Sequence, residues 1–243
     1  TLIDVKGETG TNVGGMFNGL RHDLAQLTGQ LPLEITISDL LAVDAVIPTS
    51  ISGSMAGELS MESGVALASM VKTDKVPVQK VASLLEKEMG IEVEVGGVEA
   101  EMAIRGALTT PGTRKPIVIL DMGGGSTDAA MMNESGNIIS SHLAGAGDMV
   151  TMLINSELAL RDKELAEKIK KFPLGRVLSL FHMQLEDGTM LFSEEPFPPY
   201  TFGKVVIREE KDLTPLSTKI SMEKVRKIRR TAKRRVFLTN ALR

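Results

Sequence analysis

The stretch Ile117-Val-Ile-Leu-Asp-Met-Gly-Gly-Gly-Ser-Thr-Asp128 decides the fold that we expect for this chain of 243 residues. Its first four residues form a continuous apolar run, which is typical of a strand covered on both faces. The glycines predict a tight loop, and Thr127–Met132 predicts a second strand that returns beside the first. A turn over Glu134-Ser-Gly-Asn137 and a third strand over Ile138–Leu143 complete a predicted three-stranded meander.

The loop between the first two strands has the composition of a phosphate-binding site. Glycine leaves backbone N–H groups unshielded and adopts backbone angles closed to other residues. Successive amides form a concavity for phosphate oxygens, here from Gly123, Gly124 and Gly125. Ser126 and Thr127 add hydroxyl donors, and Asp121 is placed to hold a hydrated divalent cation. The alternative is a tight hairpin that needs glycine for its geometry alone.

A second glycine turn, Gly145-Ala-Gly-Asp148, follows the third strand and precedes two predicted helices, Met149–Leu160 and Lys163–Lys171. The turn lacks the third glycine of a dinucleotide fingerprint. We therefore interpret Gly147 and Asp148 as a helix N-terminus aimed at the ligand of the first loop.

Two helices carry charges that allow more than one interpretation. Glu167 and Lys170 are three residues apart and share a helix face, which could be a solvated ion-pair face. The segment Lys219–Arg235 contains nine basic residues and one acidic residue. Its apolar stripe favours a helix packed on the sheet with a basic outer face, and binding to nucleic acid or anionic lipid is the alternative.

The rest of the chain predicts short elements and one linker. Expected strands and hairpins are Leu40–Ile47, Ile91–Val95, Phe181–Phe192 and Val205–Arg208. Expected helices are Met16–Leu27, Ser60–Val71, one from Pro77 to Met89 with Gly90 as its cap, and Val98–Leu108. The linker is Thr109–Pro116.

The composition is that of an ordinary globular protein, with 42% hydrophobic and 24% charged residues. A net charge of −3 supplies no overall field for nucleic acid or a membrane, so we expect neither partner. The absence of cysteine excludes disulfides, thiolate nucleophiles and zinc–thiolate sites, and it fits a cytoplasmic location. The histidines His22, His142 and His182 lack neighbours at metal-ligand spacing, so we expect structural roles for them and no protein-bound metal centre.

The order of these features resembles the second half of an actin-like ATPase of the ribonuclease H-like α/β class, and more narrowly its heat-shock chaperone branch. The resemblance implies that the Asp121–Asp128 hairpin is the second phosphate loop for ATP or ADP with Mg²⁺. It implies that a helix carrying Glu167, Lys168, Ile169 and Lys170 lies against the adenosine. The stretch Gly97–Ala107 matches the helix between the two lobes, where Glu99 is the positional match for an acidic residue that orients the attacking water. Residues 1–110 would then end the first lobe, and residues 116–243 would form the second.

Four further stretches resemble the large-subunit family of diol/glycerol dehydratase reactivases: Leu40–Asp44, Ala107–Thr113, His142–Thr151 and Val236–Leu242. The resemblance implies a chaperone-like ATPase that releases damaged cobalamin from an inactivated diol or glycerol dehydratase and acts with a reactivase small subunit. It implies a cytoplasmic protein or one associated with a bacterial microcompartment. The chain begins at Thr1 and ends within a helical pattern, so we expect a fragment of an incomplete fold. The family's first phosphate loop would precede Thr1, and a Gly-Gly loop would follow Arg243.

Two other functions remain open at this point. An actin-fold metabolite kinase would share the phosphate loop but need a polar substrate pocket. A non-catalytic interaction module would use the basic helix to bind an acidic partner, and its glycine loop would be only a turn.

Overall fold

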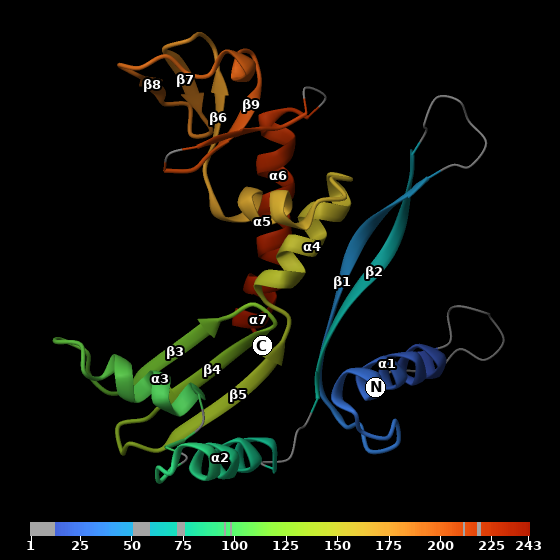
Figure 1. Cartoon of the computed structure of the whole chain (residues 1–243), viewed down its shortest axis with the longest axis vertical. Helices are drawn as coiled ribbons and strands as arrows, with labels where there is room; N and C mark the ends of the chain where they lie inside the picture. Colours follow the sequence, from blue (N-terminus) through green and yellow to red (C-terminus); the bar gives the residue numbers. More distant parts are fainter. Residues whose placement is uncertain are drawn as a thin grey trace.

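The computed structural model describes residues 13–50, 59–71, 76–94, 96–97, 99–210, 212–217 and 220–243. Over these residues the chain builds a mixed α/β arrangement around three separate antiparallel sheets, shown in Figure 1. The predicted segments that fall on other residues, including Val95, Val98 and Lys219, lie outside the described part of the chain.

The predicted meander is confirmed as the sheet β3-β4-β5, formed by Ile117–Met122, Ser126–Met132 and Ile138–Ala144. Helix α3, Glu99–Ala107, packs on this sheet through Ala100 and Ile104. Its partners Ala130 and Met132 lie toward the end of β4 that is remote from the glycine loop. The apolar core of this sheet is therefore built at one end, while the loop lies at the other.

A long antiparallel hairpin pairs β1, Ile37–Ser50, with β2, Leu59–Val71. The prediction of a helix over Ser60–Val71 is therefore wrong. Its apolar residues fit a period of two as well as helical spacing, and Ala66, Ala68 and Met70 all contact the main core. Pairing with β1 decides the conformation, because strand preference depends on neighbouring strands.

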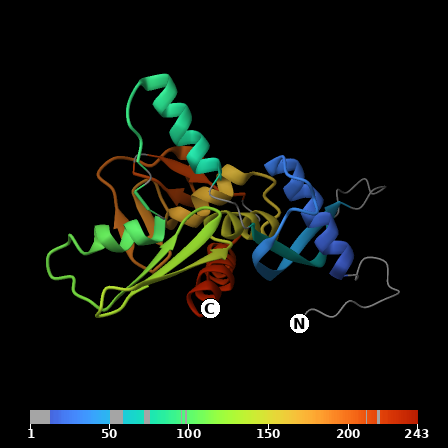
Figure 2. The same cartoon turned by 90° about the horizontal axis from the view of Figure 1, so that it is seen from below.

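Helix α2, Val76–Met89, ends at Gly90, whose φ of +63° and hydrogen bond to the Glu86 carbonyl confirm it as the cap. The strand predicted over Ile91–Val95 is wrong over residues 91–94, which form no strand. The amide of Val93 instead donates to the Glu86 carboxylate at 3.2 Å, so this segment folds back on the helix end. Figure 2 shows α2 projecting from the body of the molecule.

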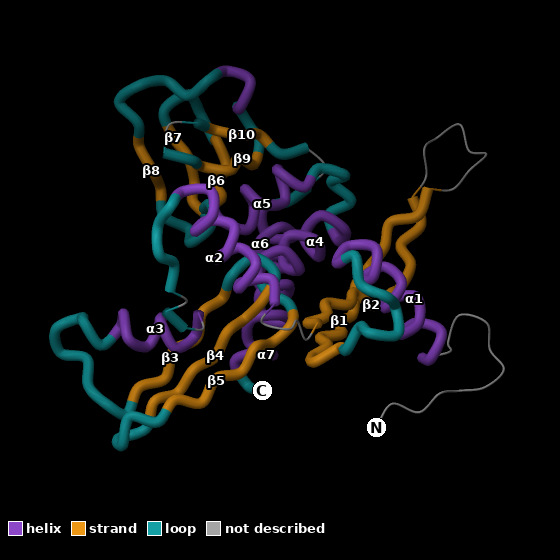
Figure 3. Tube along the Cα trace, turned by 60° about the horizontal axis from the view of Figure 1, so that its bottom comes forward, coloured by secondary structure: helices purple, strands orange, loops and turns teal. Residues whose placement is uncertain are grey.

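The main core lies where three helices meet the hairpin (Figure 3). These are α4, Gly147–Glu157, α5, Lys163–Lys171, and α6, Met222–Lys233. The first two confirm the helices predicted after Gly145, and α6 confirms a helix in the basic run. A π-helical turn over Arg234–Leu238 and the short α7, Thr239–Ala241, continue α6.

Polar contacts also join the hairpin to the helices. The Arg235 guanidinium bonds the Asp44 carbonyl at 3.0 Å and pairs with Glu157 at 2.6 Å. The Ser156 hydroxyl bonds the Val46 carbonyl.

Helix α1, Val13–Thr28, confirms the amphipathic helix expected over Met16–Leu27. Among the helices that the structure describes, none is long and apolar enough to cross a membrane.

A small sheet of order β10-β9-β6-β7-β8 is inserted between α5 and α6. Its strands are Leu174–Val177, His182–Leu185, Met190–Phe192, Val205–Arg208 and Leu213–Pro215, from β6 to β10. The hairpin predicted over Phe181–Phe192 and the strand Val205–Arg208 are both confirmed. A one-turn helix, η1, covers Pro199–Thr201.

Candidate functional site

The glycine loop is a tight connection between β3 and β4, closed by the Gly123 amide on the Ser126 carbonyl at 3.0 Å. None of its three glycines has φ in the left-handed region, whereas Gly145 does, with φ +86°. A left-handed φ is therefore not what calls for glycine at these three positions. The expectation that these glycines adopt left-handed backbone angles is wrong, and what glycine supplies is the absence of side-chain atoms.

The carbonyl groups of the loop are held by the turn that starts α4. The amides of Gly145, Gly147 and Asp148 donate to the carbonyls of residues 125, 123 and 124 at 3.0, 3.0 and 2.8 Å. The first amides of α4 therefore brace the loop, and the expectation that Gly147 and Asp148 present their amides to a ligand is wrong. Within the part of the chain that the structure describes, the amides of Gly124 and Gly125 donate to no protein group.

The loop and α4 approach each other closely. A Cβ atom on Gly147 would lie 3.1 Å from both the Gly123 carbonyl oxygen and Lys170 Nζ. A Cβ atom on Gly124 would lie 3.3 Å from Asp148 Oδ2, whereas one on Gly125 would meet nothing within 4 Å. A side chain on Gly147 would press against the loop backbone and Lys170, whereas Gly125 borders open space.

A cleft adjoins the loop on the side of the β1–β2 hairpin. It has a volume of ≈ 490 Å³ and lies between β2 and the start of α4. Leu67 and Ser69 form one wall, and Gly124, Gly125, Asp148 and Lys163 are among the residues of the other. The two amides without a protein acceptor therefore belong to residues that line a cavity.

The two hydroxyl groups of the loop are used within the protein. Thr127 is fully buried, and its Oγ1 donates to the Gly145 carbonyl at 2.9 Å. The Ser126 hydroxyl donates to Asp128 Oδ2 at 3.2 Å. The expectation that Thr127 offers a hydroxyl to phosphate is wrong because this group braces the Gly145 turn.

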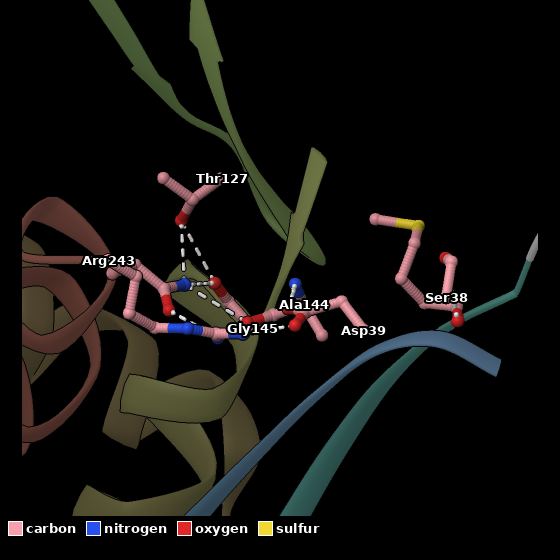
Figure 4. Close-up of polar contacts among 8 residues, drawn as sticks. Ser38, Asp39, Thr127, Ala144, Gly145 and Arg243 are labelled. Atoms are coloured by element: carbon pink, nitrogen blue, oxygen red, sulfur yellow. Dashed lines mark hydrogen bonds and ion pairs between the residues drawn. The ribbon is translucent and has the colours of Figure 1, made fainter. Parts of the chain in front are cut away.

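A buried polar junction below the loop was not expected from the sequence (Figure 4). The Asn240 side chain is 2% exposed, and its amide nitrogen lies 3.0 and 2.8 Å from the carbonyls of Ala144 and Gly145 and 3.2 Å from Thr127 Oγ1. Asp39 accepts the Ala144 amide at 2.7 Å and pairs with Arg243. Burial would raise the pKa of Asp39, but these hydrogen bonds lower it overall. The junction joins β1, β5 and α7 directly behind the loop.

Asp121, Asp128 and His142 lie directly opposite one another across β3, β4 and β5. Asp128 is 7% exposed and pairs with His142 Nδ1. Asp121 is exposed at the start of the loop. His142 therefore has a partner 14 residues away, so it is not isolated as the sequence suggested. No cluster of three or more His, Asp or Glu side chains in the described ranges could hold a metal ion, but an exposed carboxylate such as Asp121 fits a hydrated Mg²⁺.

Helix α5 presents Glu167 and Lys170 toward α4. Glu167 pairs with Lys170 at 2.7 Å and with Lys171 at 2.9 Å, and it accepts the Thr151 hydroxyl at 2.5 Å. Burial alone would raise the pKa of Glu167, but these hydrogen bonds lower it to about 2. Lys170 Nζ also bonds the Gly147 carbonyl at 3.0 Å, which ties α5 to the loop.

The structure does not bring all predicted residues to the loop. Ile169 is fully buried in the main core, so its predicted contact with adenosine is wrong. Lys168 points to Glu209 on the small-sheet side at 2.7 Å. Glu99 starts α3, and no hydrogen bond or ion pair among the described residues joins it to the loop.

The chain is thus a mixed α/β domain in which a braced glycine loop, open to a cleft, is tied to a charged helix. The family model for the diol dehydratase reactivase ATPase-like domain matches residues 1–243, and the chain belongs to this family. The resemblance of the sequence to the diol/glycerol dehydratase reactivase family is therefore confirmed.

Relatives and solved structures agree with this assignment. The chain is 53% identical over 242 residues to the diol dehydratase-reactivating factor large subunit of Klebsiella michiganensis and to the propanediol dehydratase-reactivating factor large subunit of Salmonella typhimurium. It matches a nucleotide-free diol dehydratase-reactivating factor with TM-score 0.78 at 53% identity, and a glycerol dehydratase reactivase with TM-score 0.80 at 51% identity. Each match covers at least 98% of this chain, which spans about 40% of the length of these relatives.

Proposed function

We propose that this chain is the nucleotide-binding part of a reactivating chaperone whose glycine loop binds the phosphates of ATP or ADP. The observation that carries the proposal is the pair of amides at Gly124 and Gly125, which lack a protein acceptor and border a cavity. Unused amides beside bare Cα atoms suit phosphate oxygens, because each N–H donates to an anion without obstruction. Membership of a family described as ATPase-like supports the same ligand.

The neighbouring charges give each predicted residue a role in this proposal. Asp121 would hold Mg²⁺ through water, and the ion would offset the repulsion between phosphate and the nearby carboxylate of Asp148. Glu167 and Lys170 would border the adenosine, since Lys170 bonds the Gly147 carbonyl at the edge of the loop and Glu167 pairs with Lys170. Glu99 would orient the attacking water after movement of the lobes.

The names of the relatives support a proposal for the client and the partners. We propose that the complete protein acts with a reactivase small subunit and releases damaged cobalamin from an inactivated diol or glycerol dehydratase, using ATP hydrolysis to change its hold on the enzyme. Residues 1–110 would belong to the first lobe and residues 116–243 to the second, in an actin-like fold. We propose a cytoplasmic or microcompartment-associated location. Family membership does not favour the metabolite kinase.

The substitution Gly125→Val in the full-length large subunit tests the loop. A Cβ at this position meets nothing within 4 Å. The variant protein should therefore fold without a clash, and the valine side chain should obstruct only a ligand. Gly96→Val is the matched control, since Gly96 also borders open space outside the loop. We expect Gly125→Val to lose ATP turnover and the reactivation of glycerol-inactivated dehydratase, while Gly96→Val retains both. Turnover by Gly125→Val equal to that of the control would defeat the proposal.

A further inference from the structure

A row of three polar side chains crosses the meander at the end where the glycine loop lies. Asp121 on β3, Asp128 on β4 and His142 on β5 are directly opposite one another in the strand register. Side chains that are opposite in neighbouring strands share one face of the sheet. Ala130 and Met132 of β4 continue that face into the apolar core beneath α3. The polar row therefore stands between this core and the loop.

Asp128 is the centre of a short chain of side-chain contacts. One of its carboxylate oxygens pairs with Nδ1 of the half-exposed His142, and the other accepts the Ser126 hydroxyl at 3.2 Å. Asp128 itself is 7% exposed. A nearly buried carboxylate destabilises a protein unless its oxygens have partners. Because Asp128 needs both partners, the position of Ser126 is coupled to that of His142.

This chain of contacts reaches the two amides on which the proposed function rests. The carbonyl of Ser126 accepts the Gly123 amide at 3.0 Å, and this hydrogen bond closes the turn of the loop. Gly124 and Gly125 are the two residues inside that turn. A displacement of Ser126 would therefore change the direction in which their N–H groups point.

The opposite face of β4 is held by different contacts. Thr127 points away from the face that carries Ser126 and Asp128, and its hydroxyl donates to the Gly145 carbonyl at 2.9 Å. The Gly145 amide in turn donates to the Gly125 carbonyl at 3.0 Å. These contacts attach the loop to the turn before α4 without any help from His142. Loss of the His142 side chain should therefore loosen the loop and leave the fold intact.

We propose that His142 is a positioning residue of the nucleotide site, which acts through Asp128 and Ser126 to keep the Gly124 and Gly125 amides aimed at the phosphates. This inference rests on the proposed nucleotide function and adds a residue of β5 that touches no ligand itself. Donors that are ordered before the ligand arrives lose less conformational entropy when it binds. The contribution of His142 should therefore be seen in the affinity for nucleotide.

The test uses the full-length large subunit with its small subunit and compares His142→Leu with His142→Asn. Leucine removes the group that pairs with Asp128. The amide nitrogen of asparagine is attached to Cγ, as Nδ1 of histidine is, so it can donate to the same carboxylate oxygen. His182→Leu is the matched control, because His182 is also a part-buried strand histidine, paired with the Ser179 hydroxyl at 2.6 Å, but it lies in the small sheet.

Calorimetric titration with ATP and with ADP measures Kd and the number of binding sites separately. We expect His142→Leu to raise both Kd values by about 10-fold, the effect of losing one charge-assisted hydrogen bond, with the number of sites unchanged. His142→Asn should restore the affinity, and His182→Leu should leave it unchanged. In the nucleotide-free protein, hydrogen exchange in peptides that span residues 121–128 should be faster in His142→Leu than in the other two variants.

The outcomes separate the two proposals. If Gly125→Val abolishes nucleotide binding but His142→Leu binds as tightly as His182→Leu, the positioning role is refuted and the loop proposal stands. Fewer sites at unchanged Kd, or no recovery of affinity in His142→Asn, would show that His142 only stabilises the fold, and either result would also refute the inference. If the unsubstituted protein binds no nucleotide, both proposals fail.

Discussion

Asn240 should stabilise the glycine loop from behind, and its substitution tests the structural account of the site. Its side chain is 2% exposed, and its amide nitrogen lies within 3.0 Å of the carbonyls of Ala144 and Gly145. In Asn240→Ala, the Gly145 carbonyl keeps the Thr127 hydroxyl as a donor. The Ala144 carbonyl loses its hydrogen bond from the Asn240 amide. An unsatisfied buried polar group costs about 1–3 kcal/mol. With the small cavity added, we expect a loss of about 2–3 kcal/mol.

Hydrogen exchange followed by mass spectrometry measures this effect in the full-length protein. A loss of about 2–3 kcal/mol corresponds to roughly 30- to 150-fold faster exchange in peptides that span residues 121–150, if they open locally. Asn137→Ala is the control, because Asn137 is exposed in a turn at the other end of the sheet. Equal exchange rates in Asn240→Ala and Asn137→Ala would show that Asn240 does not stabilise the loop.

Asn240→Asp adds a pH signature to the same test. An ionised carboxylate would face two carbonyl oxygens, so burial and repulsion should raise its pKa in the folded state above the unfolded value of about 3.9. A raised folded pKa means that the folded state favours the protonated form, so the variant should lose stability as the pH rises through that pKa. Thermal unfolding should therefore show a larger defect at pH 7 than at pH 5. A defect that is independent of pH would contradict this account.

Three further predictions concern stability. Gly145→Ala should lower the free energy of unfolding in urea by about 2–4 kcal/mol, because φ is +86° and the new Cβ would lie 2.6 Å from Leu41 Cδ2. Gly125→Ala is the control and should change this free energy by less than about 0.5 kcal/mol. The pKa of Glu167 is about 2 in the folded protein and 4.5 when unfolded, so its ionised form should contribute up to about 3 kcal/mol to the free energy of unfolding above pH 4.5. This contribution should be lost as the pH falls toward 2. Glu167→Gln should therefore weaken the dependence of stability on pH in that acidic range. Arg229→Met should lower stability by about 3 kcal/mol, since it leaves the part-buried Glu186 without its ion-pair partner, and Arg226→Met should cost less.

The sequence predicted the elements whose signals are local. The apolar run at Ile117, the turn at Gly136 and the helical periodicity of α4 and α5 each lie within a few residues, and these elements formed where they were expected. The expectation that the Ile117 strand is covered on both faces is wrong, because β3 is the edge strand of its sheet and Val118 is 68% exposed. The region of β2 could not be assigned in this way, because its apolar spacing fits a helix and a strand equally. Its partner β1 decides the outcome through a register that spans the full length of both strands.

The fine structure of the site depends on contacts between distant residues, which periodicity does not reveal. Asn240 reaches Thr127 across 113 positions, and Asp39 reaches Ala144 across 105. The buried state of Thr127 and Ile169 also follows from tertiary packing. A polar residue inside an apolar stretch, such as Asn240 within Val236–Leu242, was the only local signal of the junction.

The most direct measurement is a crystal structure of the full-length large subunit with a non-hydrolysable ATP analogue and Mg²⁺. We expect phosphate oxygens about 2.7–3.2 Å from the amide nitrogens of Gly124 and Gly125. A nucleotide bound elsewhere, with both amides still open to solvent, would contradict it.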